Sequence, residues 1–374
     1  MKFIKAVAVL MGTVVGAGIF ALPYVIAQVG FMVGLGYLFL FAAIFLIVNL
    51  CYGEVVLRTR GDLEMSDYAK KYLGNWGKLL ITLSLMLGIY GAMVTYTIGV
   101  GNFLHNLLSP AIGGSAFLWS IIFWTIASFI IYKGVGIVSQ IETFMAIALI
   151  FVVLFVFFLS YSSIDMTNLV FTDLAKLFLP YGVILFAFGG ASAIPTMKRI
   201  LKGEEGKLKP AIILGSLLPL IIYVIFVFAV VGVTGVNTSE TAILGLADIT
   251  GGKVFLIGGV FGILAMTTSF LGLGHILREL WHRDYNFPVL PAWAVTVGVP
   301  LFLFIGGLKS FVNVLSVSGG LLSGIQGIVL LLVFYEAKKR GTRKPEFNIH
   351  FPKLFSYLFY FVLIIGIIYQ IVNI

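Results

Sequence analysis

The sequence is poor in charge and almost free of cysteine. Only 10% of its 374 residues are Asp, Glu, Lys or Arg, and its mean hydropathy is +1.12. A soluble domain is about 25% charged, so most of this surface is predicted to face lipid rather than water. The single cysteine, Cys51, excludes an internal disulfide framework, and four scattered histidines argue against a structural metal site. A GxxxxGK[ST] nucleotide-binding motif is also missing, which argues against an ATP-driven pump.

Long apolar runs are what the sequence has instead. A membrane-spanning helix needs about 20 apolar residues. Eleven segments meet this requirement: 4–28, 31–57, 78–108, 115–132, 138–160, 177–199, 210–235, 253–278, 289–307, 311–336 and 353–373. Each is predicted to be helical, because backbone groups exposed to lipid must be satisfied within their own segment. We interpret the first as a span rather than a cleaved signal peptide, because its apolar run continues through Pro23 to Gln28 without a convincing cleavage site.

The basic residues predict an orientation. With the N-terminus inside, 21 of the 24 Lys and Arg residues fall in cytoplasmic segments, and only Lys176, Lys253 and Lys309 fall outside. By the positive-inside rule, the N-terminus is cytoplasmic, and an odd number of spans places the C-terminus outside the plasma (cell inner) membrane. The net charge of +9 is therefore a topology signal spread over loops, and no nucleic-acid partner is expected.

Two spans share helix-breaking residues at mid-depth: Gly12, Gly16, Gly18 and Pro23 in the first, and Gly189, Gly190 and Pro195 in the sixth. Glycine and proline both weaken a helix. Residues 18–23 and 190–195 also align at a constant offset of 172 positions. These spans open two successive five-span blocks, which must then be inverted relative to each other. Interrupted spans at matching positions indicate a transporter's central site, although close helix packing is an alternative reason for the glycines.

Broken helices free backbone groups that can bind an amino acid. The N-terminus of a half-helix favours a carboxylate, and freed carbonyls favour an ammonium group or a metal cation. The predicted substrate-binding residues are Val15, Gly16, Ala17, Gly18, Tyr90, Phe186, Phe188, Gly189, Gly190, Ala191 and Thr267, with Tyr96, Thr97, Ser316 and Ser318 as further candidates. No charged residue is evident among them, so we expect a neutral substrate, hydrophobic or aromatic in character.

Span 8 carries Thr268 and Ser269 near mid-depth. Their hydroxyls could bind Na⁺ together with carbonyls of Gly12 and Val15 from the broken first span. The alternative is that the hydroxyls bond to carbonyls of the preceding turn, as Ser and Thr often do in helices.

Two ionisable residues are candidates for a gate or a proton relay. Glu142 lies about one turn into span 5, and His275 lies near the end of span 8. Ionisable groups within membrane spans are functional hypotheses by default. A solvated helix end or ion pair for Glu142, and a cytoplasmic anchor for His275, are the alternatives.

The run Gly12–Pro23 resembles the first span of permeases of the amino acid–polyamine–organocation superfamily, and it is most similar to the aromatic and hydroxy amino acid permeases and the amino acid/auxin permeases. Residues 54–61 and 69–74 resemble the second span and following loop of the tryptophan/tyrosine permease group. The resemblance implies the leucine-transporter fold, an all-α five-plus-five inverted repeat with broken helices 1 and 6. Its repeats would be residues 1–161 and 177–338, followed by an extra helix at 353–374.

The resemblance also bears on the coupling ion. It implies a sodium site between spans 1 and 8, formed by Gly12, Val15, Ala265, Thr268 and Ser269. Some proton-coupled relatives place a lysine from span 5 there, and residues 139–160 contain none. Permeases of the aromatic and hydroxy group are nevertheless often regarded as proton-coupled, so both ions stay open.

The sequence thus predicts a symporter that imports neutral amino acids by alternating access, coupled to Na⁺, with proton coupling as the alternative. A channel is less favoured because no repeated pore motif is found, and no catalytic dyad or cluster points to an enzyme. We expect no cofactor besides the coupling ion, an amino-acid substrate and the lipid bilayer as partners, and a monomer.

Overall fold

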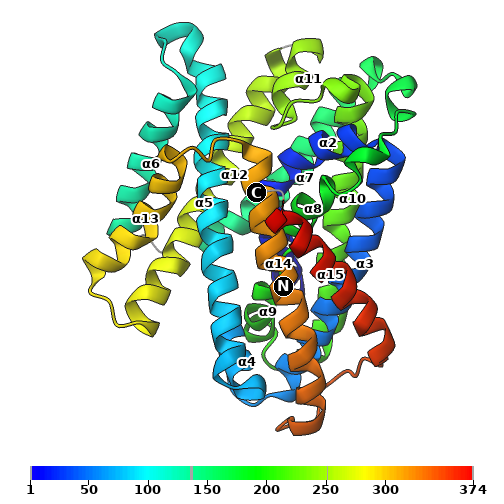
Figure 1. Cartoon of the computed structure of the whole chain (residues 1–374), viewed down its shortest axis with the longest axis vertical. Helices are drawn as coiled ribbons and strands as arrows, with labels where there is room; N and C mark the ends of the chain where they lie inside the picture. The colour runs from blue at the N-terminus through cyan, green and yellow to red at the C-terminus, as the bar shows by residue number, and fades with distance from the viewer. Residues whose placement is uncertain (1, 135–137, 251, 373–374) are drawn as a thin grey trace.

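The computed structural model describes the backbone of residues 2–134, 138–250 and 252–372. All regular secondary structure within these ranges is helical (Figure 1). The long helices are α3 (Phe31–Arg58), α5 (Asn75–Ile112), α6 (Ala116–Lys133), α7 (Val138–Ser160), α10 (Leu208–Thr234), α12 (Gly252–Glu279), α13 (Val289–Ile305), α14 (Phe311–Arg340) and α15 (Lys353–Val372). The prediction of an all-α chain is confirmed.

The helices have the length and composition of membrane spans. Among the described residues, eight helices can cross a membrane, or nine when the bent pair α1 (Lys2–Val14) and α2 (Gly18–Val29) is one span. Helix α13 and the stretch Ala148–Ser163 are shorter apolar helices. Every predicted span coincides with one helix or one broken pair, while the total of eleven stays a prediction, as do the boundaries of the two repeats.

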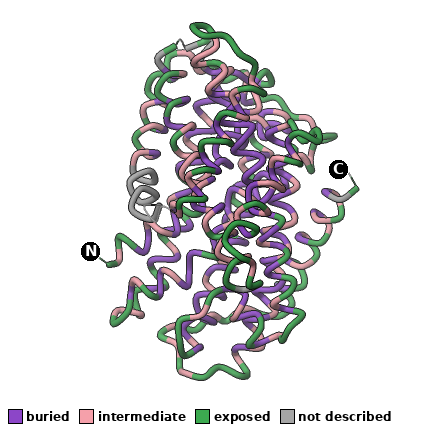
Figure 2. The backbone as a smooth tube through the Cα atoms, turned by 90° about the vertical axis from the view of Figure 1, so that its left-hand side faces the viewer, coloured by how far each residue is buried: buried purple, intermediate pink, exposed green. Residues whose placement is uncertain are grey.

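Large apolar side chains cover much of the outside. Phe302, Phe158 and Leu354 are 78%, 72% and 76% exposed, whereas buried residues fill the interior (Figure 2). A soluble protein rarely exposes apolar patches on this scale, so these side chains face lipid. The chain is an integral membrane protein.

Both predicted helix breaks are present. Helices α1 and α2 meet at an angle of 52° across Val15–Ala17. Helix α8 (Pro180–Phe188) ends at Gly189, and the chain resumes as α9 (Ile194–Ile200) after a short 3₁₀ turn at Ala191–Ala193. Gly189 is extended at ψ 107° and Gly190 has φ −148°, so neither residue continues the α-helix.

Two short helices lie in segments that the sequence marks only as polar connections. Helix α4 (Met65–Leu73) falls within 58–77 and packs on α5 and α14, and α11 (Ile243–Thr250) falls within 236–252 and packs on α12 and α10. Helix α4 begins with a reciprocal capping box between Glu64 and Asp67. Both helices are too short to cross a membrane, with nine residues in α4 and eight in α11, so a search for membrane spans misses them.

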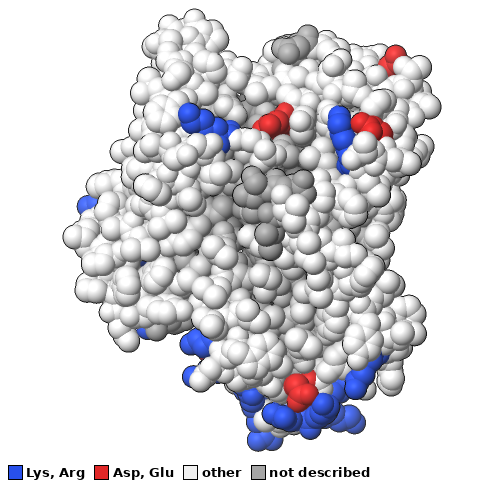
Figure 3. Space-filling view, in the orientation of Figure 1, with Lys and Arg blue, Asp and Glu red and all other residues white. Residues whose placement is uncertain are grey.

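Basic residues gather at the end of the molecule where α4 lies. Figure 3 shows Lys and Arg crowded at the lower end of the visible face, near α4 and the end of α14. We call this the basic end. Residues there are tied together by hydrogen bonds, such as that from Lys2 Nζ to the carbonyl of Lys202 (2.8 Å). The buried Glu54 carboxylate accepts from Arg58 Nε, one helical turn on, at 2.6 Å and from Ile349 N at 2.5 Å.

Candidate substrate and ion site

The two helix breaks pack directly on each other. A Cβ placed on Gly18 would lie 2.9 Å from the Cα and Cβ of Ala187, and one placed on Gly190 would lie 2.4 Å from Val14 Cγ2. Both distances are shorter than a normal carbon–carbon contact, so close packing explains these two glycines. Gly16 differs, because its added Cβ would meet only the Tyr96 hydroxyl, at an ordinary 3.5 Å.

Unwinding leaves backbone groups free at both breaks. Among the described residues, no acceptor is present for the N–H groups of Gly16, Ala17 and Gly190, and no donor is present for the carbonyls of Gly12 and Val15. Unpaired backbone groups away from water are costly, so they call for a ligand or water. The free amides just before α2 suit a carboxylate, and the carbonyls after α1 suit a cation.

Access to this region differs between its two sides. Gly12, Val15 and Gly16 are partly exposed, whereas the residues of α2 that follow are almost all buried. On that side Phe20 packs edge-on against Phe103 and Phe226, with ring centroids 5.7 and 6.4 Å apart. The break is therefore closed toward the end that carries α11 and more accessible from the basic end.

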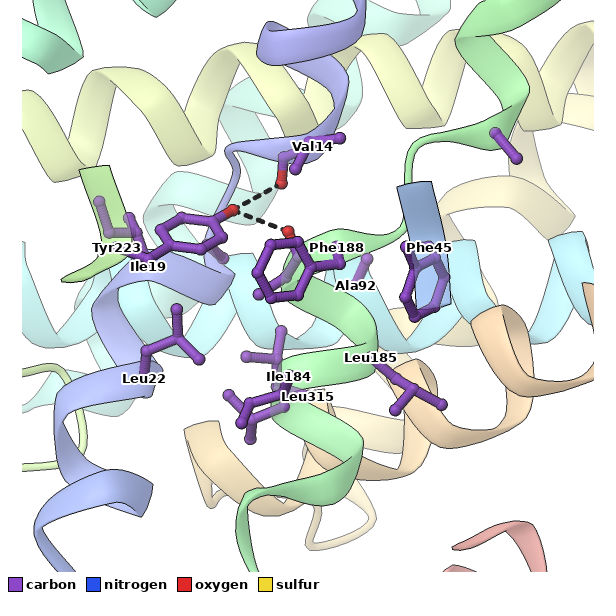
Figure 4. Close-up of a cluster of buried hydrophobic side chains, with 14 of the residues drawn as sticks. Val14, Ile19, Leu22, Phe45, Ala92, Ile184, Leu185, Phe188, Tyr223 and Leu315 are labelled. Carbon is purple, nitrogen blue, oxygen red and sulfur yellow. Dashed lines mark hydrogen bonds between the residues drawn. The ribbon is translucent and has the colours of Figure 1, made fainter. Parts of the chain in front are cut away.

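Aromatic and hydroxyl side chains surround the two helix breaks. Phe186 is partly exposed beside the break, while Phe188 is buried between Phe45 and Tyr223 (Figure 4). Ser323 of α14 is buried without a hydrogen-bond partner, and its Oγ lies 2.6 Å from the position of a Cβ on Gly189. Phe186 is thus the better placed of the two predicted aromatics to contact a substrate.

Two polar residues at the breaks escape sequence reasoning. Sequence patterns indicate Ser316 and Ser318 rather than Ser323. In the structure Ser316 accepts a hydrogen bond from Gln370, and Ser318 donates one to the Val314 carbonyl. Tyr223 lies inside an α10 that is apolar throughout, and its hydroxyl contacts both breaks. The position of Ser323 along its span, at the depth of the glycines in span 6, is a signal that could have identified it. No sequence signal marks the direction in which Tyr223 points.

Other predicted site residues lie apart from the breaks. The Tyr90 hydroxyl donates to the Val295 carbonyl (3.4 Å) and accepts from Trp281 Nε1 (3.1 Å), so it joins α5 to α13 and the end of α12. His275 lies one turn before Glu279 near the end of α12. The side chain of Glu142 lies outside the described residues.

The predicted cation ligands come from α1, from the break that follows it and from α12. Thr268 Oγ1 donates to the Ala265 carbonyl at 3.0 Å, and Thr267 Oγ1 donates to the Ile263 carbonyl at 2.6 Å. Within the described residues, α1 and α12 share no extended packing contact, while α7 packs against both. Neutral oxygens are the ligands that hard cations prefer, so the residues fit Na⁺ in kind, although α1 and α12 hold them on separate helices.

Solved structures with this architecture define the fold. The chain resembles "Inward facing conformation of Mhp1" with a TM-score of 0.67 and 16% identity, covering 99% of this chain and 89% of that one. It also resembles MhsT in complex with L-phenylalanine, with a TM-score of 0.64 and 16% identity over 99% and 97% of the two chains. The fold is therefore the leucine-transporter fold.

Sequence comparison gives the family. The chain matches the tryptophan/tyrosine permease family over residues 1–373 and belongs to it. It is 26% identical to "Tyrosine-specific transport system 1" of Haemophilus influenzae, with 92% of this chain and 90% of that protein covered. It is 23% identical to "Glutamine transporter 2" of Aliivibrio fischeri, over 93% and 92%. The protein is accordingly an amino-acid transporter.

Proposed function

We propose that this permease imports neutral amino acids, aromatic ones foremost, by symport with Na⁺. The observation that carries the proposal is the pair of packed breaks with free amides at Gly16 and Ala17 and free carbonyls at Gly12 and Val15. Such a site offers a separate contact for each end of a zwitterion. No described ion pair involves a break residue, which favours a substrate with an uncharged side chain.

The aromatic preference has two supports. The partly exposed Phe186 offers a ring for contact with a substrate ring. Three similar proteins carry tyrosine or tryptophan in their names, and one carries glutamine. Glutamine is therefore the neutral substrate against which the aromatic preference must be measured.

Sodium is favoured by the chemistry of the oxygens. The carbonyls of Gly12 and Val15 have no donor in the part of the chain that the structure describes, and span 5 supplies no lysine to replace a cation. Proton coupling is the second candidate, because Thr268 satisfies its hydroxyl within its own helix. Under that alternative, Glu142 and His275 become the residues to test.

The orientation follows from the basic end. With this end in the cytoplasm, the N-terminus is cytoplasmic and the C-terminus external, and the more accessible side of the break faces the cell interior. Alternating access would then open the opposite side by separating Phe20 from Phe103 and Phe226.

The test is uptake into proteoliposomes of labelled L-tyrosine, L-tryptophan and L-glutamine under an imposed Na⁺ gradient or an imposed pH gradient. We expect a Na⁺ gradient to drive uptake without a pH gradient, with the aromatic substrates preferred over L-glutamine. Uptake that follows the pH gradient and ignores Na⁺ would replace sodium by the proton as coupling ion. Failure to transport any neutral amino acid would refute the substrate class.

A further inference from the structure

One buried hydroxyl joins the two broken helices. Tyr223 of α10 is fully buried, and its hydroxyl lies 3.0 Å from the Val14 carbonyl and 2.7 Å from the Ala187 carbonyl. Figure 4 shows the hydroxyl between the two oxygens. The Tyr223 ring packs edge-on against Phe188, with centroids 5.4 Å apart. A single side chain thereby fixes α1 and α8 at the point where each half-helix ends.

The two carbonyls have the same electrostatic character. Val14 is the last residue of α1, and Ala187 is the last but one of α8. The C-terminal end of a helix carries partial negative charge on its carbonyls. Two such ends brought together repel each other unless a donor or cation lies between them, and the Tyr223 hydroxyl supplies that donor.

The Tyr223 hydroxyl cannot satisfy the Val14 and Ala187 carbonyls at the same time. A tyrosine hydroxyl carries one hydrogen, so it can donate fully to only one of the two carbonyls at a time. The other carbonyl keeps its capacity to accept. Val14 and Ala187 are themselves buried, but Val15 and Phe186, which adjoin them in the chain, are partly exposed, so the carbonyl pair lies directly behind the accessible residues.

We propose that Tyr223 is the positioning residue for the substrate's α-ammonium group. Its hydroxyl holds the Val14 and Ala187 carbonyls side by side, and the carbonyl that does not receive its hydrogen accepts from the ammonium. An ammonium group has three donors, so it supplements the single hydroxyl hydrogen between the two helix ends. The inference rests on the proposed function, since it concerns how an amino acid is recognised at that site.

Tyr223→Phe removes only the hydroxyl and keeps the ring that packs on Phe188. Tyr181→Phe is a matched control, because Tyr181 is also buried, lies on α8, and donates to a backbone carbonyl, that of Leu363, at 3.0 Å. Both variants lose a tyrosine hydroxyl and the hydrogen bond that this hydroxyl donates to a backbone carbonyl. They differ in whether that bond joins the two breaks.

The first measurement is competition for labelled L-tyrosine by unlabelled L-tyrosine and by 3-(4-hydroxyphenyl)propionate, which lacks the ammonium. We expect Tyr223→Phe to reduce the preference for L-tyrosine over this analogue by about 10-fold, because the two carbonyls are no longer held in place and one carbonyl loses its hydrogen bond from the charged ammonium. Tyr181→Phe should keep the wild-type preference. An unchanged preference in Tyr223→Phe, or an equal loss in Tyr181→Phe, would overturn the inference.

The second measurement needs no substrate. Hydrogen–deuterium exchange of peptides spanning residues 10–22 and 183–195 should speed up at both breaks in Tyr223→Phe and stay at the wild-type rate in Tyr181→Phe. If exchange at both breaks is unchanged in Tyr223→Phe, the inference fails. If the wild type binds no L-tyrosine, it is the proposed function that fails, and this second measurement still decides whether Tyr223 positions the two breaks.

Discussion

Helix α1 takes part in two junctions that are built differently. At the first, α1 and α2 meet α8 and α10 through backbone-level contact, with Gly18 against Ala187 and the Tyr223 hydroxyl between two carbonyls. At the second, where the predicted Na⁺ ligands would meet, α1 and α12 share no extended contact among the described residues. The first junction is closed by the protein itself, and at the second the proposed Na⁺ would be the link between the two helices.

The difference suggests how substrate and ion are coupled. A ligand shifts a conformational equilibrium only by binding one state better than the other. A cation held by oxygens from both α1 and α12 can exist only when these helices come together, so its binding favours that state. The proposed substrate site involves the same broken helix, and any strengthening of substrate binding by the ion would be matched by an equal strengthening of ion binding by the substrate.

The largest effect is expected from adding a side chain where α1 and α2 meet α8 and α10, which we call the closed junction. In Gly18→Ala the new Cβ would lie 2.9 Å from the Ala187 backbone, which cannot yield as a flexible side chain could. Overpacking costs about 1–3 kcal/mol, so uptake should fall by roughly 10-fold or more. Gly36→Ala in α3 is the control, because its added Cβ meets nothing within 4 Å. Equal uptake by both variants would show that the junction is not close-packed.

The second effect concerns the place where α1 and α12 would share the cation, which we call the open junction. Thr268→Ala combined with Ser269→Ala removes the two hydroxyl ligands, and the Na⁺ concentration for half-maximal uptake should rise by about 10-fold or more, since each ligand contributes on the order of 1 kcal/mol. Thr125→Ala is the control, because this hydroxyl of α6 also bonds within its own helix, to the Ile121 carbonyl at 2.8 Å. An unchanged Na⁺ dependence in the double variant would mean that the hydroxyls are only structural.

The smallest effect is expected at the edge of the closed junction. Ser323 is buried beside Gly189 without a partner, and Ser323→Ala should weaken substrate binding by about 5-fold if a ligand supplies the missing hydrogen bond. Ser128→Ala in α6 is matched, since that hydroxyl is buried and unpartnered too. Both variants should fold as the wild type does. Equal binding by the two would exclude Ser323 from the site.

The sequence predicts the breaks well because their cause is local. Glycines at positions 16, 18, 189 and 190 weaken the helix wherever it packs, and both interruptions fall on them. Tyr223 could not be predicted, because α10 is apolar on every side and its buried face depends on tertiary packing. How closely α1 and α12 pack could not be predicted either, because it depends on the tertiary arrangement of helices that are distant in sequence.

The most direct measurement is the distance between α1 and α12 with and without Na⁺. Ile4→Cys and Ile276→Cys are suitable labelling positions, because Ile4 is 71% and Ile276 is 55% exposed, while the native Cys51 is fully buried. The pair Ile4→Cys with Leu214→Cys on α10 is the control, because α1 packs directly on α10.

Double electron–electron resonance between nitroxides on each pair should show the α1–α12 distance shortening in Na⁺ relative to K⁺, and the α1–α10 distance staying constant. An α1–α12 distance that is the same in Na⁺ and K⁺ would contradict assembly of the open junction by sodium.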